Sequence, residues 1–133
     1  MDANGLVTLP SHHSAAETLD RLTNALQAKS VRVFARIDHA AGAAEVGQAL
    51  RPTTVVIFGN PAAGTPLMQH DQRIGLDLPL KALVWQDAGG QAWLTYGDPV
   101  WLAARYELSD DAVPAARRLR EVLAGLAAVA TGP

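Results

Sequence analysis

The side chain best suited to proton transfer in this sequence belongs to His39, which follows Asp38 at the end of an apolar run. An imidazole at the edge of a hydrophobic core titrates near neutral pH, so it can exchange protons or hold a ligand. The structural alternative is a ring that bonds a backbone carbonyl and stabilises the turn after the strand. Asp38 points to the opposite face of a regular strand, so the two side chains do not form a dyad. His39 is therefore a candidate general acid/base that acts without Asp38.

Lys81 is the second candidate for catalysis, because it opens an apolar strand and points to the same face as Leu83 and Trp85. A lysine among apolar neighbours can have a lowered pKa and act as a base or form an imine. Alternatively, its long side chain reaches water and pairs with an acid such as Asp77 or Asp38. The two interpretations differ in whether the amine opens into a cleft or onto the surface.

The segment Phe58-Gly-Asn-Pro61, followed by Gly64-Thr-Pro66, is typical of a strand, a tight loop and the start of a helix. A helix N-terminus carries unpaired amides and partial positive charge, so this loop predicts a site for a carboxylate or phosphate. In the alternative, the glycines and prolines only shape the backbone. The segment is neither a Walker A loop nor a dinucleotide fingerprint. The candidate ligand-binding residues are Asn60, Gly64, Thr65, Arg51 and Asp77.

Several chemistries lack the residues that they require. There is no cysteine, which excludes disulfides, thiolate catalysis and zinc sites built on sulfur. His12 and His13 are adjacent and point apart in an extended segment, and neither His-Glu-x-x-His nor Gly-x-Ser-x-Gly occurs. We therefore predict no metal site and no cofactor. A single axial histidine on a haem iron, His39 or His70, stays open because that ligation needs no motif.

The composition is that of an ordinary globular protein, with 133 residues, 49% hydrophobic and 18% charged. The 11 lysines and arginines are scattered, so no nucleic acid partner is expected. The longest apolar stretch, residues 122–130, is far shorter than the ~20 residues of a membrane span, and no secretory signal is visible. We expect one α+β domain over residues 1–133, located in the cytoplasm and not in a membrane.

The hydrophobic periodicity predicts five strands and several helices. Ser14 and Glu17 form a capping box before an amphipathic helix over residues 15–29, and Asp98-Pro99 starts another near residue 100. Thr65-Pro66 predicts a third helix start, and residues 43–50 a short helix. The strands are expected at residues 5–9, 31–39, 54–58, 80–86 and 91–96, and the last helix from about residue 110. This β-α-β-β-β-β-α order predicts a single, mainly antiparallel sheet with helices on one face.

Alternation within the strands predicts which residues each face of the sheet carries. In residues 31–39 the set Val31, Val33, Ala35, Ile37 and His39 is expected to face the helix at 15–29. The opposite face then carries Phe34, Trp85 and Trp93, which would be an unusually apolar exposed patch. A symmetric homodimer is the favoured cover for this face, and a ligand is the alternative.

Several segments resemble one known family. They are Asp38-His39, Leu50-Arg-Pro52, Phe58-Gly-Asn-Pro61, Gly64-Thr-Pro-Leu67 and Gly75-Leu-Asp-Leu-Pro-Leu-Lys81. In order and spacing they resemble the bacterial and archaeal family called domain of unknown function 302, from about residue 7 to residue 106. The resemblance implies a compact βαβββα domain, similar to the TATA-binding-protein fold class and often dimeric. It implies no activity.

Three functional hypotheses follow. The first is a dimeric module that binds or senses a small anionic molecule, with its pocket near His39, Asn60, Thr65 and Lys81. The alternative is a small enzyme that uses His39 as general acid/base and Lys81 as electrostatic partner on an anionic substrate. That enzyme requires both side chains to open into one cleft. The third is a purely structural or partner-docking subunit.

Overall fold

The computed structural model describes residues 1–133 and is built around a five-stranded antiparallel sheet. Along the sheet the strand order is β1-β5-β4-β3-β2, so the first strand pairs with the last and β2 forms the far edge. The predicted α+β class with one antiparallel sheet is confirmed. The strands are β1 (Leu6–Pro10), β2 (Arg32–Asp38), β3 (Thr53–Gly59), β4 (Leu80–Gln86) and β5 (Ala92–Gly97).

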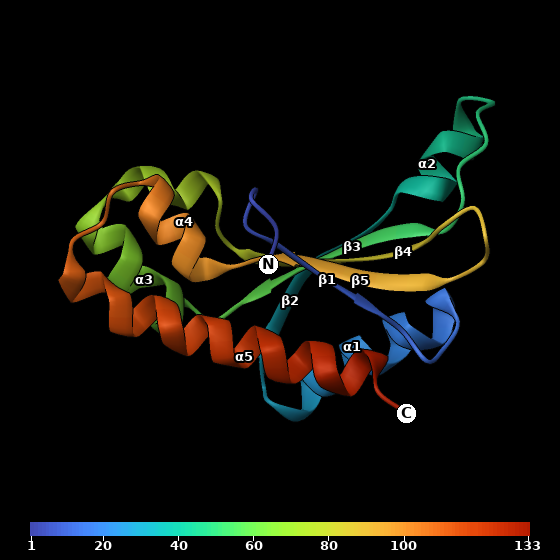
Figure 1. Ribbon diagram of the computed structural model, residues 1–133. Coiled ribbons are helices and arrows are strands. Elements are labelled where there is room, and N and C mark those ends of the chain that lie inside the picture. Colours follow the sequence, from blue (N-terminus) through green and yellow to red (C-terminus); the bar gives the residue numbers. More distant parts are fainter.

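Helices cover one face of this sheet and extend past both of its ends. In Figure 1 the long helices α1 and α5 run side by side beneath the sheet, α3 and α4 gather at one end, and α2 projects at the other. None of the helices combines the length and the apolar character that crossing a bilayer requires. The helical elements are α1 (Ala15–Ala28), α2 (His39–Glu45), α3 (Pro61–His70), η1 (Gln72–Leu76), α4 (Pro99–Arg105), η2 (Asp110–Ala112) and α5 (Val113–Thr131).

The core lies between the covered face of the sheet and the two long helices. The alternating residues of β4 and β5 are buried on this face, as their pattern predicts. Helix α1 begins where the capping box places it, with the Ser14 hydroxyl accepting from the Glu17 amide at 3.1 Å. The buried apolar side chains form one cluster, which includes Leu22, Leu26, Val56, Phe58, Ala82, Val84, Leu94, Leu119, Leu123 and Leu126.

Strand β2 contains a β-bulge that its sequence does not predict. Val33 lies opposite Phe58 and Ala35 lies opposite Ile57, so Phe34 is an extra residue without a partner on β3. An inserted residue reverses the alternation of the side chains that follow it. The faces predicted for β2 therefore hold before Phe34 and are exchanged after it.

Beyond the bulge, Arg36 and Asp38 lie opposite Val56 and Thr54 on the helix-covered face. Ile37 is turned to the open face, where 43% of it is exposed. The expectation that Ala35, Ile37 and His39 face α1 is therefore wrong. The cause is the bulge, because strict alternation was assumed over the whole strand.

His39 does not end a strand at the rim of the core; it is the first residue of α2 and is exposed. Asp38 is the N-cap, and its carboxylate accepts from the Ala41 amide at 2.9 Å. An aspartate cap satisfies an amide that the first turn leaves unpaired, so the helix begins here. The short helix predicted at residues 43–50 accordingly covers residues 39–45.

An ion pair between the buried Asp98 and the exposed Arg120 joins α4 to α5. Asp98 caps α4, as predicted, by accepting from the Val100 amide at 2.9 Å. Arg120 of α5 donates to both of its carboxylate oxygens, at 3.0 and 2.6 Å. Burial alone would raise the pKa of Asp98, but the hydrogen bonds from Arg120 and Val100 outweigh it and hold the pKa below its usual value.

Replacing Arg120 by Gln removes this bidentate contact and leaves the buried Asp98 carboxylate without its cation. We expect the free energy of unfolding at neutral pH to fall by about 2 kcal/mol, the usual size for hydrogen bonds to charged groups. Because folding lowers the pKa of Asp98, the contribution is present above the unfolded-state value of about 3.9 and is lost as the pH falls below it. Urea unfolding of both proteins across this pH range measures the difference.

The matched control is Arg118→Gln, on the exposed surface of the same helix and outside the ion pairs of the structure. It should change the free energy of unfolding by less than about 0.5 kcal/mol at any of these pH values. Equal stability of the two variants at neutral pH would show that the pair contributes nothing.

Candidate functional site

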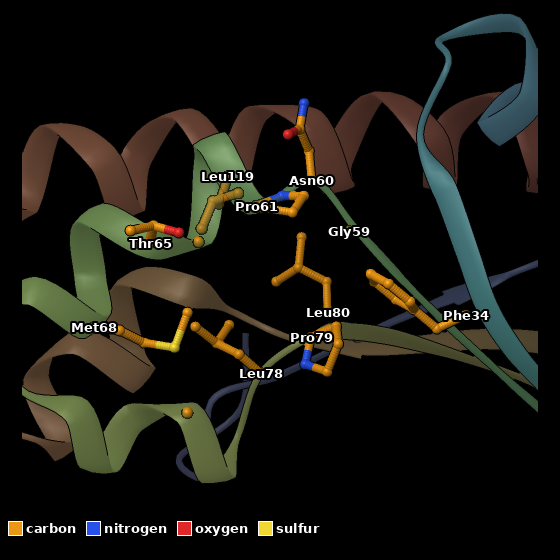
Figure 2. Close-up of a pocket in the computed structure, with 12 residues that line it drawn as sticks. Phe34, Gly59, Asn60, Pro61, Thr65, Met68, Leu78, Pro79, Leu80 and Leu119 are labelled. Atoms are coloured by element: carbon orange, nitrogen blue, oxygen red, sulfur yellow. The ribbon is translucent and has the colours of Figure 1, made fainter.

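A cavity of about 220 Å³ opens between the start of α3, residues 75–80 and the bulge of β2. Figure 2 shows α3 on one side, the Leu78–Pro79 segment on the other, and Phe34 beside the end of β3. Its lining is almost entirely apolar, and Asn60 and Thr65 are its polar side chains. The hydrophobic walls are Phe34, Met68, Leu78, Leu80 and Leu119.

Three of the five predicted ligand-binding residues, Asn60, Gly64 and Thr65, line this cavity. Arg51 and Asp77 do not. The Arg51 guanidinium donates to the Gln86 carbonyl at 3.3 Å, beside the start of β3 and away from α3. The structure thus brings together the residues of one loop and leaves out the two that sequence reasoning added from elsewhere.

Helix α3 begins at Pro61 with Asn60 as its cap, and not at Thr65-Pro66 as predicted; Pro66 lies inside the helix. Asn60 precedes a proline, and that pair is itself a cap followed by N1, so the helix starts at the first competent signal. Thr65 is therefore one turn into the helix. Figure 2 shows its hydroxyl turned toward the cavity and the Asn60 amide turned away.

The first-turn amides of α3 are already paired. The Ala62 amide donates to the Asn60 side chain at 2.9 Å, and the Ala63 and Gly64 amides donate to the Asn60 carbonyl at 2.9 and 3.1 Å. Pro61 has no amide hydrogen. The predicted mechanism of anion binding, through free amides at this helix end, is therefore not available.

His39 and Lys81 are not brought into one cleft. Asp38, next to His39, pairs with Thr54 on β3, whereas Lys81 pairs with Ile57 from the other side. Strand spacing and rise put their backbones roughly 15 Å apart. Neither side chain lines the cavity. The exposed Lys81 amine donates to the carbonyls of Asp77 and Pro79, both at 3.3 Å, and not to a carboxylate.

Asp77 holds one wall of the cavity in place. Its carboxylate accepts from the Tyr106 hydroxyl and, at 3.1 Å, from the Arg105 guanidinium, both at the end of α4. These bonds fix the chain just before Leu78 and Pro79, which line the cavity. The hydrogen bond to Asp77 also raises the pKa of Tyr106, because the carboxylate opposes a second negative charge.

The open face of the sheet carries the two predicted tryptophans. Trp85 and Trp93 lie directly opposite each other on β4 and β5 and stack with ring centroids 6.0 Å apart. Both indole N–H groups are satisfied within the chain, by Thr95 at 2.9 Å and by Asp87 at 2.9 Å. Phe34, predicted to lie with them, instead lines the cavity near the opposite end of β3.

The chain is similar to one protein family over most of its length. The family model described as domain of unknown function DUF302 matches residues 7–126. The chain belongs to this family. A crystal structure of an uncharacterised conserved DUF302 protein from Bacillus stearothermophilus superposes on 93% of this chain and 96% of that chain, with a TM-score of 0.82 and 20% identity. The resemblance drawn from the sequence is confirmed, and the neighbour has the same fold.

Curated relatives of this chain carry a functional name. Proteins called fluoride-specific ion channel FluC 1, from Brucella suis and Brucella abortus, are each 51% identical to this DUF302 chain over 115 residues. The match covers 84% of this chain but only 45% and 43% of those proteins. The chain thus spans less than half the length of the relatives that bear the channel name.

Sequence reasoning misses the apolar walls of the DUF302 cavity, although glycines give a signal for them. A Cβ at Gly64 would lie 3.7 Å from Leu78, and one at Gly75 would lie 3.3 Å from Met68. Both glycines line the cavity, and they keep it open because neither has a side chain that would fill it. Neither glycine has a positive φ, so backbone conformation does not explain its presence. Such glycines in an apolar helix and the loop after it are the sequence signal that could have indicated the cavity.

Both tyrosines of this DUF302 protein should ionise above the usual pKa of about 10. Burial raises the pKa of Tyr96, and the hydrogen bond to Asp77 raises that of Tyr106. In Asp77→Asn the second cause disappears, so one of the two transitions in the tyrosinate absorbance should move to lower pH. Tyr106→Phe identifies that transition by removing it. If Asp77→Asn leaves both midpoints unchanged, the contact does not form in solution.

Proposed function

We propose that this protein is a small-molecule binding module of the cytoplasm, and that its ligand occupies the cavity beside α3. The observation that carries the proposal is a preformed, apolar cavity of about 220 Å³. Ligand sites are typically concave and mostly apolar, with few polar groups that fix orientation. An apolar cavity of about 150 Å³ can hold benzene, so this one fits a body of about one ring with a short substituent.

The lining favours a ligand with an apolar body. Thr65 offers one hydroxyl to the interior, and the α3 amides are paired among themselves. A charged group deep inside would lose its hydration without compensation, which is unfavourable. Any charge on the ligand therefore belongs at the rim of the cavity and not at its floor.

The geometry does not favour the enzyme hypothesis. It needs His39 and Lys81 in one cleft, but His39 begins α2 and Lys81 lies on β4, near opposite ends of β3. Neither contacts the cavity that would hold a substrate. Binding without chemistry is the function that the placement of these residues supports best.

A Gly64→Leu variant tests the cavity directly. The new side chain enters the cavity next to Leu78, and a helical glycine replaced by leucine loses no helix propensity. We expect the wild type to gain thermal stability with small aromatic and medium-chain compounds, and the variant to gain none. At a ligand concentration of 100 times Kd the gain corresponds to about 2.7 kcal/mol.

The matched control for that experiment is Gly42→Leu. Gly42 also lies within a helix, and a Cβ there meets no atom within 4 Å. This variant should respond to each compound as the wild type does. Loss of the response in both variants, or its survival in Gly64→Leu, would place the ligand elsewhere.

We further propose that two copies associate through the open face of the sheet. This face carries apolar side chains on four of its strands, including Ile37, Ile57, Leu83 and the Trp85–Trp93 pair. Its charged side chains, Arg32 and Lys81, lie toward the Gly59 end of β3 and away from the tryptophan pair, and depletion of charge marks the cores of protein interfaces. The indole N–H groups are already bonded, so the rings offer apolar surface that a second identical face can cover.

The dimer is tested by Leu83→Lys, which puts a charge at the centre of the open face. We expect light scattering to give a dimer mass for the wild type and a monomer mass for the variant. Leu76→Lys is the matched control, because Leu76 is 83% exposed on η1, away from this face. A wild type that stays monomeric at every concentration, or a control that also dissociates, would rule out this interface.

The relatives named as fluoride channels suggest a second role. We propose that in those proteins the matched part is a binding module linked to a transport function, supported by 51% identity over 115 residues. Fluoride itself is a poor ligand for the apolar cavity, since a small anion needs several donors to replace its hydration. Sodium fluoride should therefore stabilise this domain against heat no more than sodium chloride does. A fluoride-specific shift would reassign the ligand.

A further inference from the structure

One cation, Arg32, neighbours the cavity without lining it. Arg32 lies directly opposite Gly59 on β3, and Gly59 lines the cavity. The Arg32 guanidinium carbon lies 5.8 Å from the centre of the Phe34 ring, which also lines it. The register and the ring contact thus place Arg32 next to two residues that line the cavity.

The bulge in β2 produces this arrangement. Phe34 is the unpaired residue of the bulge, which frees its ring from the regular alternation and lets it lie beside Gly59, 3.6 Å from where a Cβ would be. Gly59 has no side chain, so the Phe34 ring can approach the backbone at the edge of the cavity. A bulge commonly redirects a side chain in this way.

Arg32 has no anionic partner within the protein. The arginines that form ion pairs are Arg73, Arg105 and Arg120, and Arg32 takes part in no side-chain hydrogen bond. No aspartate or glutamate lines the cavity. A guanidinium presents its donors in a fork that matches a carboxylate, so the unused donors at this rim fit one such group.

We propose that the ligand of this cavity is a small monocarboxylate with an apolar body, held by Arg32 at the rim and by the hydrophobic walls inside. The inference rests on the proposed function, because it assigns a ligand class to the same cavity. One unpaired arginine matches one negative charge, whereas a phosphate dianion would keep a second charge without a partner. The apolar body is limited to about one ring or a chain of six to eight carbons by the volume.

The experiment compares matched pairs of acid and alcohol by titration calorimetry. The probes are 3-phenylpropionate against 3-phenylpropan-1-ol, and hexanoate against hexan-1-ol. Acetate is the control, because it has the carboxylate but almost no apolar part. We expect the wild type to bind at least one acid five- to tenfold more tightly than its alcohol, and acetate not at all. Added salt should reduce the preference because the guanidinium is exposed.

The decisive variant is Arg32→Gln, which should lower the affinity for the acid to that of the alcohol and leave the alcohol unchanged. Arg36→Gln is the matched control: it lies on the same exposed strand, but the bulge turns it to the helix-covered face. It should leave both affinities as in the wild type. An acid preference that survives Arg32→Gln, or falls equally in Arg36→Gln, overturns the inference.

The outcomes separate this inference from the proposed function. If the alcohols bind, Gly64→Leu abolishes their binding and the acids show no preference, the cavity binds ligands but Arg32 does not select them. If neither acids nor alcohols bind the wild type at millimolar concentration, the proposed function fails and the inference fails with it.

Discussion

The extra residue in β2 is the constraint on which the candidate site depends. Because Phe34 has no partner on β3, the strand changes face at this point. Arg32 and Phe34 stay beside the cavity, whereas Arg36 and Asp38 turn toward α1. A regular strand would send Arg36 and Asp38 to the open face. One inserted residue thus decides which side chains a ligand meets.

The start of α3 sets the chemical character of the same site. Asn60 and Pro61 begin the helix directly after β3, so the first turn satisfies its own amides. What remains facing the cavity is hydrocarbon, together with the Thr65 hydroxyl. The Asp77 contacts at the end of α4 hold the opposite wall. The cavity is therefore apolar because polar groups that could have lined it are used elsewhere.

Features with local causes are predictable from the sequence. The caps at Ser14 and Asp98 depend on residues a few positions apart, and the alternation of β4 and β5 follows directly from burial on one face. The antiparallel fold and the family resemblance follow from the same local signals. Asn60, Gly64 and Thr65 can be grouped from the sequence because their residue types are those of a helix start, and all three line the cavity.

The bulge in β2 and the starts of two helices could not be predicted from local patterns, because more than one arrangement fits the same residues. The bulge at Phe34 depends on how β2 registers with β3, and that register is a property of the pair and not of either strand. Asp38-His39 fits both a strand end and a helix cap, and the cap prevails. Asn60-Pro61 and Thr65-Pro66 are both competent helix starts, and the earlier one prevails. The apolar walls come from four separate segments, which no single pattern connects.

The placement of the bulge on an outer strand also bears on how the molecule avoids unwanted association. β2 forms one border of the sheet, and a straight border strand offers unsatisfied backbone groups to any extended chain that approaches. Here the border is bent at Phe34 and carries Arg32, Arg36 and Asp38. At the other border, β1 is five residues long and ends in Pro10, which cannot donate. Both margins are thus poor templates for edge-to-edge aggregation.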